Sequence, residues 1–110
     1  MNHTKTMSVA LMASWMIGSV TVAHADPGNA EAAKSKISMC QGCHGVPGYK
    51  VAFPATYHVP RLGGQHPEYI VSALQAYKKG ERSFKTMQAI AEGLSDQDMA
   101  DIAAYYGSAK

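Results

Sequence analysis

The most specific chemical signal in the sequence is the run Cys40-Gln41-Gly42-Cys43-His44. Its C-x-x-C-H pattern is the signature at which a haem is attached covalently to a protein. Residues three and four apart share one face of a helix, so a single turn would present both thiols and the imidazole together. We therefore predict one covalent haem c, with thioether bonds to Cys40 and Cys43 and with His44 as an iron ligand.

Two other uses of a C-x-x-C pair fit the sequence less well. A thioredoxin-type motif lowers a thiol pKa in order to exchange disulfides, but it is expected beside a βαβ pattern, which this sequence does not show. A structural zinc ion takes four Cys or His ligands. Such a site would have to recruit His58 or His66 in addition to the C-x-x-C-H residues, so haem attachment remains the favoured interpretation.

The second iron ligand must approach from the opposite face of the haem. After residue 25 the candidates, leaving out His44, are Met39, Met87, Met99, His58 and His66. Met39 is next to the attachment motif, Met99 belongs to an apolar helical stripe, and the two histidines fit exposed loop positions, where His66 could cap a helix. Met87 lies in a short segment with few other apolar side chains and far enough from His44 to return over the ring. The residues favour Met87, with ordinary core packing as the alternative.

The first 25 residues are typical of a secretory signal peptide. A weakly positive start with Lys5 precedes an almost uncharged apolar stretch at residues 7–23, and Ala23-His24-Ala25 supplies the small residues that signal peptidase requires. A membrane anchor is the alternative, but the strongly apolar part is shorter than the roughly 20 residues that span a bilayer. We expect cleavage after Ala25, export to the periplasm, a single domain at residues 26–110 and no stable membrane anchor afterwards.

The charge and the size of the domain after residue 25 argue against nucleic-acid binding and for a buried cofactor. Nine Lys and Arg face eight Asp and Glu after residue 25, which gives no basic excess of the kind that nucleic-acid binding shows. A domain this short often needs a supplement to its core. With only two cysteines, Cys40 and Cys43, several disulfides are impossible, so a buried cofactor is the natural supplement.

Residues 26–64 divide into a predicted helix and a predicted loop. Residues 30–39 are rich in Ala, Lys, Ser and Ile and predict a first helix that runs into Cys40. Gly and Pro recur throughout residues 41–64, which predicts a loop without long regular elements. This loop also carries Tyr49, Phe53 and Tyr57, and two roles are open for these rings: covering a haem edge or packing the loop.

Helical periodicity returns in the second half of the chain. Apolar residues at i, i+3, i+4 and i+7 mark one helix from Pro67 to just before Gly80 and another after the capping residue Ser95. Between them, residues 86–92 predict a short helix that ends at Gly93. No segment with strand periodicity is long enough to build a sheet, so the predicted fold class is all-α, with about four helices.

Several of these segments resemble the class I cytochromes c, in particular the small bacterial cytochrome c-553 and cytochrome c4-like domains. The resemblance covers nearly the whole chain after residue 25. It is carried by residues 40–45, 60–65 (PRLGGQ), 69–82 (YIVSALQAYKKGER), 87–91 (MQAIA) and 94–106 (LSDQDMADIAAYY). The resemblance implies a cytochrome c fold, in which the helices wrap around one covalently bound haem and the first and last helices cross.

The resemblance also assigns roles to individual residues. The methionine at the position of Met87 is the distal iron ligand in this family. Pro60 and Leu62 match the segment that lines the histidine side of the haem, where the Pro60 carbonyl would accept the second N–H of His44. For the helix crossing, the expected contacts are Ile37 on the first helix and Ile102 or Tyr105 on the last.

With both axial positions of the iron filled, the implied activity is one-electron transfer, without substrate binding. No nucleophile, acid–base pair or phosphate loop predicts an independent enzyme. The alternatives are a dedicated cytochrome subunit of a periplasmic dehydrogenase and a haem sensor from which Met87 detaches. Four cations could steer an acidic redox partner or could simply form a solvated helix end: Lys78, Lys79, Arg82 and Lys85.

Overall fold

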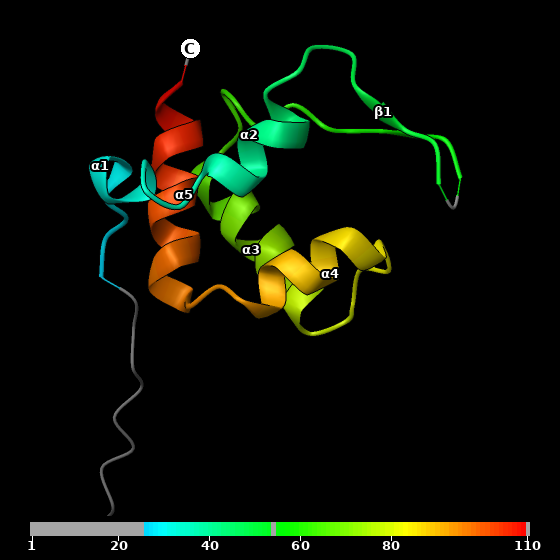
Figure 1. The fold of residues 1–110 in the computed structure, drawn as a ribbon. Helices are drawn as coiled ribbons and strands as arrows, with labels where there is room; N and C mark the ends of the chain where they lie inside the picture. Colours follow the sequence, from blue (N-terminus) through cyan, green and yellow to red (C-terminus); the bar gives the residue numbers. More distant parts are fainter. Residues whose placement is uncertain (1–25, 54, 110) are drawn as a thin grey trace, which may run out of the picture.

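The structure is a computed structural model that describes residues 26–53 and 55–109 (Figure 1). The predicted signal peptide, residues 1–25, lies outside the described residues. The fold is mostly helical, as predicted, and contains α1 (Ala30–Ala33), α2 (Ser38–His44), α3 (Pro67–Lys78), α4 (Lys85–Glu92), α5 (Asp96–Ser108) and the short strands β1 (Lys50–Val51) and β2 (Tyr57–His58). Within the described ranges, no helix is both long enough and apolar enough to cross a membrane.

The predicted first helix is divided into two. Asn29 caps α1 by accepting the N–H groups of Glu31 and Ala32 at 3.0 and 3.3 Å. After α1 the chain tightens, because the N–H groups of Lys36 and Ile37 both donate to the carbonyl of Ala33. The prediction of one continuous helix was therefore wrong, since the Ala-rich composition of residues 30–39 carries no sign of this turn.

The predicted loop is shorter than expected and contains a small hairpin. Helix α2 continues to His44, so the loop begins at Gly45. Strands β1 and β2 pair antiparallel, with Lys50 opposite His58, and the hairpin extends away from the helices (Figure 1). Sequence alternation missed these strands because each is only two residues long.

The last three helices follow the predicted boundaries closely. Helix α3 begins at Pro67 and is followed by Gly80 at φ +77°, a left-handed conformation that favours glycine. Its N-cap residue, His66, makes no capping bond with its side chain. Helix α5 begins with a capping box, in which the Ser95 hydroxyl accepts the Asp98 N–H and the Asp98 carboxylate accepts the Ser95 N–H.

The helices pack around a core on α5. Helix α5 lies against α1 and α3, and α3 also packs against α4. Ile37 and Ile102 belong to the same buried cluster, with Tyr105 partly buried beside it. Ile37 was expected on the first helix, but it lies between α1 and α2 as the N-cap residue of α2. Met99 is fully buried in this cluster, which confirms its predicted packing role.

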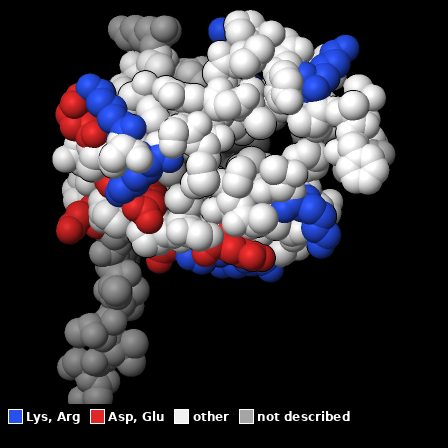
Figure 2. Space-filling model, viewed as in Figure 1, with Lys and Arg blue, Asp and Glu red and all other residues white. Residues whose placement is uncertain are grey.

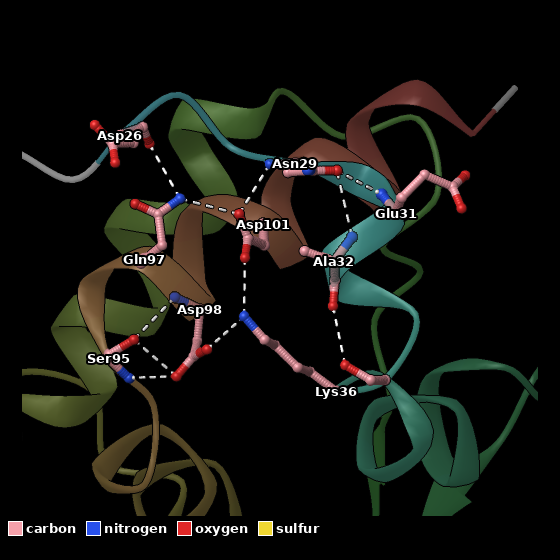
Figure 3. Close-up of polar contacts among 10 residues, drawn as sticks. Asp26, Asn29, Glu31, Ala32, Lys36, Ser95, Gln97, Asp98 and Asp101 are labelled. Carbon is pink, nitrogen blue, oxygen red and sulfur yellow. Dashed lines mark hydrogen bonds and ion pairs between the residues drawn. The ribbon is translucent and has the colours of Figure 1, made fainter.

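A polar network fastens the N-terminal segment to α5 (Figure 3). The buried carboxylate of Asp101 accepts the Asn29 N–H at 2.8 Å, the Lys36 ammonium at 2.8 Å and the Gln97 amide at 3.0 Å. Lys36 also contacts Asp98 at 2.7 Å. The hydrogen bond from Lys36 is the main cause that lowers the pKa of Asp98 to about 2 and holds the pKa of Asp101 below its usual range.

We predict that Asp101→Asn destabilises the haem-loaded protein at pH 7 by about 1–3 kcal/mol, because it removes charge-assisted hydrogen bonds from a buried group. A carboxylate with a lowered folded-state pKa stabilises the fold above its unfolded pKa of about 3.9, and this contribution is lost as the pH falls through the folded pKa. The difference between wild type and variant should therefore shrink as the pH falls below about 4 in denaturant unfolding.

Glu31→Gln is the control for this experiment. Its carboxylate pairs with Lys34 on the surface, where both side chains are more than half exposed, so the loss should be below about 1 kcal/mol. An Asp101→Asn deficit that stays the same from pH 7 to pH 2 would show that the charge of Asp101 does not stabilise the fold.

Candidate functional site

Helices α2, α3 and α4 and the hairpin enclose an apolar pocket. Figure 2 shows an opening between the hairpin and the body of the helices. The pocket brings together all six residues that the sequence assigned to a cofactor site. These residues are Cys40, Cys43, His44, Pro60, Leu62 and Met87.

The imidazole of His44 is held in one orientation. Its Nδ1 atom lies 2.7 Å from the carbonyl oxygen of Pro60, a distance at which an N–H on Nδ1 donates a hydrogen bond to that oxygen. This bond uses Nδ1 as the donor nitrogen of the ring. The lone pair of Nε2 remains available, since a neutral imidazole carries one donor and one acceptor nitrogen. His44 is therefore prepared to bind a metal through Nε2.

Both cysteine thiols are free and half-buried at the edge of this pocket. Burial raises the pKa of the Cys40 thiol, whereas disulfide exchange of the thioredoxin type relies on a lowered thiol pKa. His58 and His66 are exposed and do not line the pocket. Within the described ranges, no group of three or more His, Cys, Asp or Glu residues is placed to hold a metal ion, which gives the zinc alternative no support.

Two methionines line the pocket, and they come from different elements. Met87 lies on α4, partly buried against the edge of the core. Met39 lies on α2, the same helix that carries His44, and is 56% exposed. Met99 is in the core and does not line the pocket. Of the two, only Met87 belongs to a different helix from the attachment motif.

Aromatic side chains close one edge of the pocket. Tyr57 on β2 stacks on Phe84, the residue before α4, with ring centroids 5.3 Å apart and planes 26° apart. Both rings line the pocket, whereas Phe53, elsewhere in the hairpin, is 88% exposed and Tyr49 does not line the pocket. Of the three loop aromatics, only Tyr57 lines the pocket, and its side chain remains half exposed.

Sequence reasoning missed part of the pocket wall. Tyr69, Arg82 and Phe84 all line the pocket, but none was assigned to it. One available signal was the spacing of Tyr69, Ala73 and Tyr77, which places them four residues apart along one edge of α3. Nothing in the sequence marks Phe84 as a partner of Tyr57, because the two residues meet only in the folded chain.

The cytochrome c family model matches residues 25–110 of the chain. Cytochrome c-554(548) of Halomonas halodenitrificans is 44% identical over 84 residues, which cover 74% of this chain and 96% of that protein. Cytochrome c4 of Pseudomonas aeruginosa is 39% identical over 94 residues, covering 86% of this chain and 44% of that protein. The cytochrome subunit of sulfide dehydrogenase of Chlorobaculum tepidum is 35% identical over 69 residues, which cover 63% of this chain and 58% of that protein.

A solved structure shows the same fold. The crystal structure of reduced recombinant cytochrome c4 from Pseudomonas stutzeri superimposes with a TM-score of 0.60 at 33% identity, over 76% of this chain and 46% of that chain. The present chain therefore spans nearly the whole length of cytochrome c-554(548) but less than half of these cytochrome c4 chains.

The chain belongs to the cytochrome c family, and within it to the class I, cytochrome c4-like proteins. Proteins of this family carry electrons and hold haem c covalently, so haem c is the cofactor. The site fits this group. Its walls are apolar, two free thiols lie at one edge, and the imidazole of His44 has one nitrogen committed to Pro60 and the other available.

We predict that Tyr57→Ala lowers the midpoint potential of the haem-loaded protein by on the order of tens of millivolts, because solvent exposure is one of the factors that set haem potentials. Removing the ring opens the stacked edge, and water stabilises the more highly charged ferric state. A redox titration measures the shift. Phe53→Ala is the matched control, since it deletes an aromatic ring from the same hairpin outside the pocket, and equal shifts in the two variants would contradict this role for Tyr57.

Proposed function

We propose that this chain is a periplasmic one-electron carrier whose haem c is attached through Cys40 and Cys43 and bound axially by His44 and Met87. The observation that carries the proposal is the placement of these four side chains around one apolar pocket, with His44 on α2 and Met87 on α4. With both axial positions supplied by the chain, no site remains for a substrate.

Each residue has a distinct task in this proposal. Thioether bonds from Cys40 and Cys43 hold the cofactor to α2, and the Pro60 carbonyl keeps Nε2 of His44 directed at the metal. Leu62 and the apolar face of α3 exclude water from the pocket. When bound, a haem with His and Met ligands supplies reversible one-electron chemistry at a raised potential. The protein therefore orients the ligands and keeps the surroundings dry.

We also propose that residues 1–25 are a signal peptide and that the domain comprises residues 26–110. The family match begins at residue 25, next to the predicted cleavage site after Ala25. Covalent haem attachment agrees with export, because in bacteria this reaction takes place outside the cytoplasm. Redox partners would then be met in the periplasm.

The proposed partner surface is smaller than the four cations of the sequence prediction. Lys78 donates a hydrogen bond to the Leu94 carbonyl, and Arg82 donates to the Tyr69 hydroxyl. Lys78, Lys79 and Lys85 are all exposed, but within the described ranges Lys79 and Lys85 make no side-chain hydrogen bond or ion pair. We propose that Lys79 and Lys85 contribute to an encounter with an acidic redox partner, which would weaken as ionic strength rises.

A second candidate function is that of a dedicated subunit in a dehydrogenase complex. The similarity to the cytochrome subunit of sulfide dehydrogenase favours it. An independent carrier should sediment as a single folded species when purified alone and should reduce and reoxidise fully. A chain that aggregates without a partner, yet is stable in a complex, would support the subunit function instead.

Visible spectroscopy tests the proposed ligands. The wild-type protein should show a sharp c-type band when reduced and a weak far-red band when oxidised, and it should not bind carbon monoxide. Met87→Ala should abolish the far-red band and admit carbon monoxide, because it opens one axial position. Met39→Ala is the matched control, since it removes a methionine that lines the same pocket from α2. Loss of the far-red band in Met39→Ala alone would transfer the ligand role to Met39.

A further inference from the structure

The side chain of Arg82 is held against the wall of the pocket by two tyrosines of α3. Its Nη2 atom donates a hydrogen bond to the Tyr69 hydroxyl at 3.1 Å. The guanidinium lies 5.6 Å from the centroid of the Tyr69 ring and 5.4 Å from that of Tyr77. All three side chains line the pocket. The guanidinium of Arg82 is therefore held along the pocket wall, where it remains partly exposed.

The backbone of this loop does not need the Arg82 side chain to keep its path. The N–H groups of Glu81 and Arg82 both donate to the Ala76 carbonyl, at 2.8 and 3.2 Å. Gly80 supplies the left-handed conformation that turns the chain at the end of α3. These backbone contacts fix the loop, so the orientation of the guanidinium is a separate feature.

The guanidinium lacks a negative partner in the part of the chain that the structure describes. A guanidinium carries five N–H donors, and one hydrogen bond, to Tyr69, is present. The ion pairs of the described residues involve Lys34 and Lys36, not Arg82, and no described Asp or Glu lines the pocket. Because a partly buried charge is costly unless it is paired, an anion from outside the chain fits this position.

We propose that Arg82, oriented by Tyr69 and Tyr77, binds a propionate carboxylate of the haem. Apart from the iron, the two propionates are the charged groups of haem, and the planar fork of arginine matches the geometry of a carboxylate. This inference rests on the haem c of the proposed function but not on Met87 as a ligand. It also assigns Arg82 to the cofactor, whereas the sequence placed Arg82 in a cluster of four cations that could steer a protein partner or form a solvated helix end.

Arg61 is the other arginine that lines the pocket, and it provides the contrast that the experiment needs. It is exposed, follows Pro60 directly and makes no side-chain hydrogen bond within the described ranges. Its guanidinium has no aromatic ring beneath it there, whereas that of Arg82 has two. The preformed orientation favours Arg82 over Arg61 as the propionate ligand.

Infrared difference spectroscopy of the reduced and oxidised haem-loaded protein, carrying haem with ¹³C-labelled propionates, tests the proposal. Arg82→Gln should shift the labelled carboxylate band, because the guanidinium partner is lost. Arg82→Lys should shift the band less, because the lysine ammonium retains the positive charge without the planar fork of arginine. This variant replaces Arg82→Gln in the experiment if the glutamine variant does not fold. Lys85→Gln is the matched control, because it removes the same charge from an exposed position outside the pocket wall.

Two outcomes would overturn the proposal. The labelled band could stay unchanged in both Arg82 variants, as in Lys85→Gln, which would leave Arg82 as a packing residue. Alternatively, the band could shift in Arg61→Gln and not in Arg82→Gln, which would assign the propionate to Arg61. Either result is separate from a failure of the proposed function, because a wild-type chain without a c-type visible band would show no haem at all.

Discussion

The side chains of Cys40, Cys43 and His44 come from one turn of α2 and line the same apolar pocket. The other walls of that pocket come mainly from elsewhere in the chain. Helices α3 and α4 and the hairpin each contribute a side of it. Apolar side chains of these elements therefore face the pocket as well as the core on α5. In so short a chain the cofactor completes the interior, and the fold and the redox site are one structure.

The polar network on α5 extends this dependence to the N-terminal segment. Lys36 lies two residues before α2, and it is fastened to Asp98 and Asp101 on α5. Ile37 beside it is buried in the core. The start of the helix that carries the attachment motif is thus anchored by an ion pair on one side and by apolar packing on the other. This anchor gives His44 and the thiols a fixed base.

The sequence predicted features that depend on neighbouring residues and missed those that depend on distant ones. Both ends of α3 and the start of α5 follow from Pro67, Gly80 and the Ser95 capping box, which act within one turn. The break between α1 and α2 was missed, and it places Lys36 within reach of carboxylates more than 60 residues away. The six residues assigned to the site all line one pocket. They could be assigned from the sequence because a spacing motif or a family pattern marks each of them. The stacking of Tyr57 on Phe84 has no local signal.

The distribution of carboxylates also governs how two copies of this chain meet. No Asp or Glu occurs between Glu31 and Glu68, the stretch that includes the attachment motif and the hairpin. Lys50 on the hairpin and Lys85 on α4 are exposed beside residues of the pocket wall. These lysines would oppose the approach of two identical molecules through this side. If this side is the docking surface, as proposed, electron self-exchange between copies would be slow at low ionic strength, whereas an acidic redox partner would be attracted.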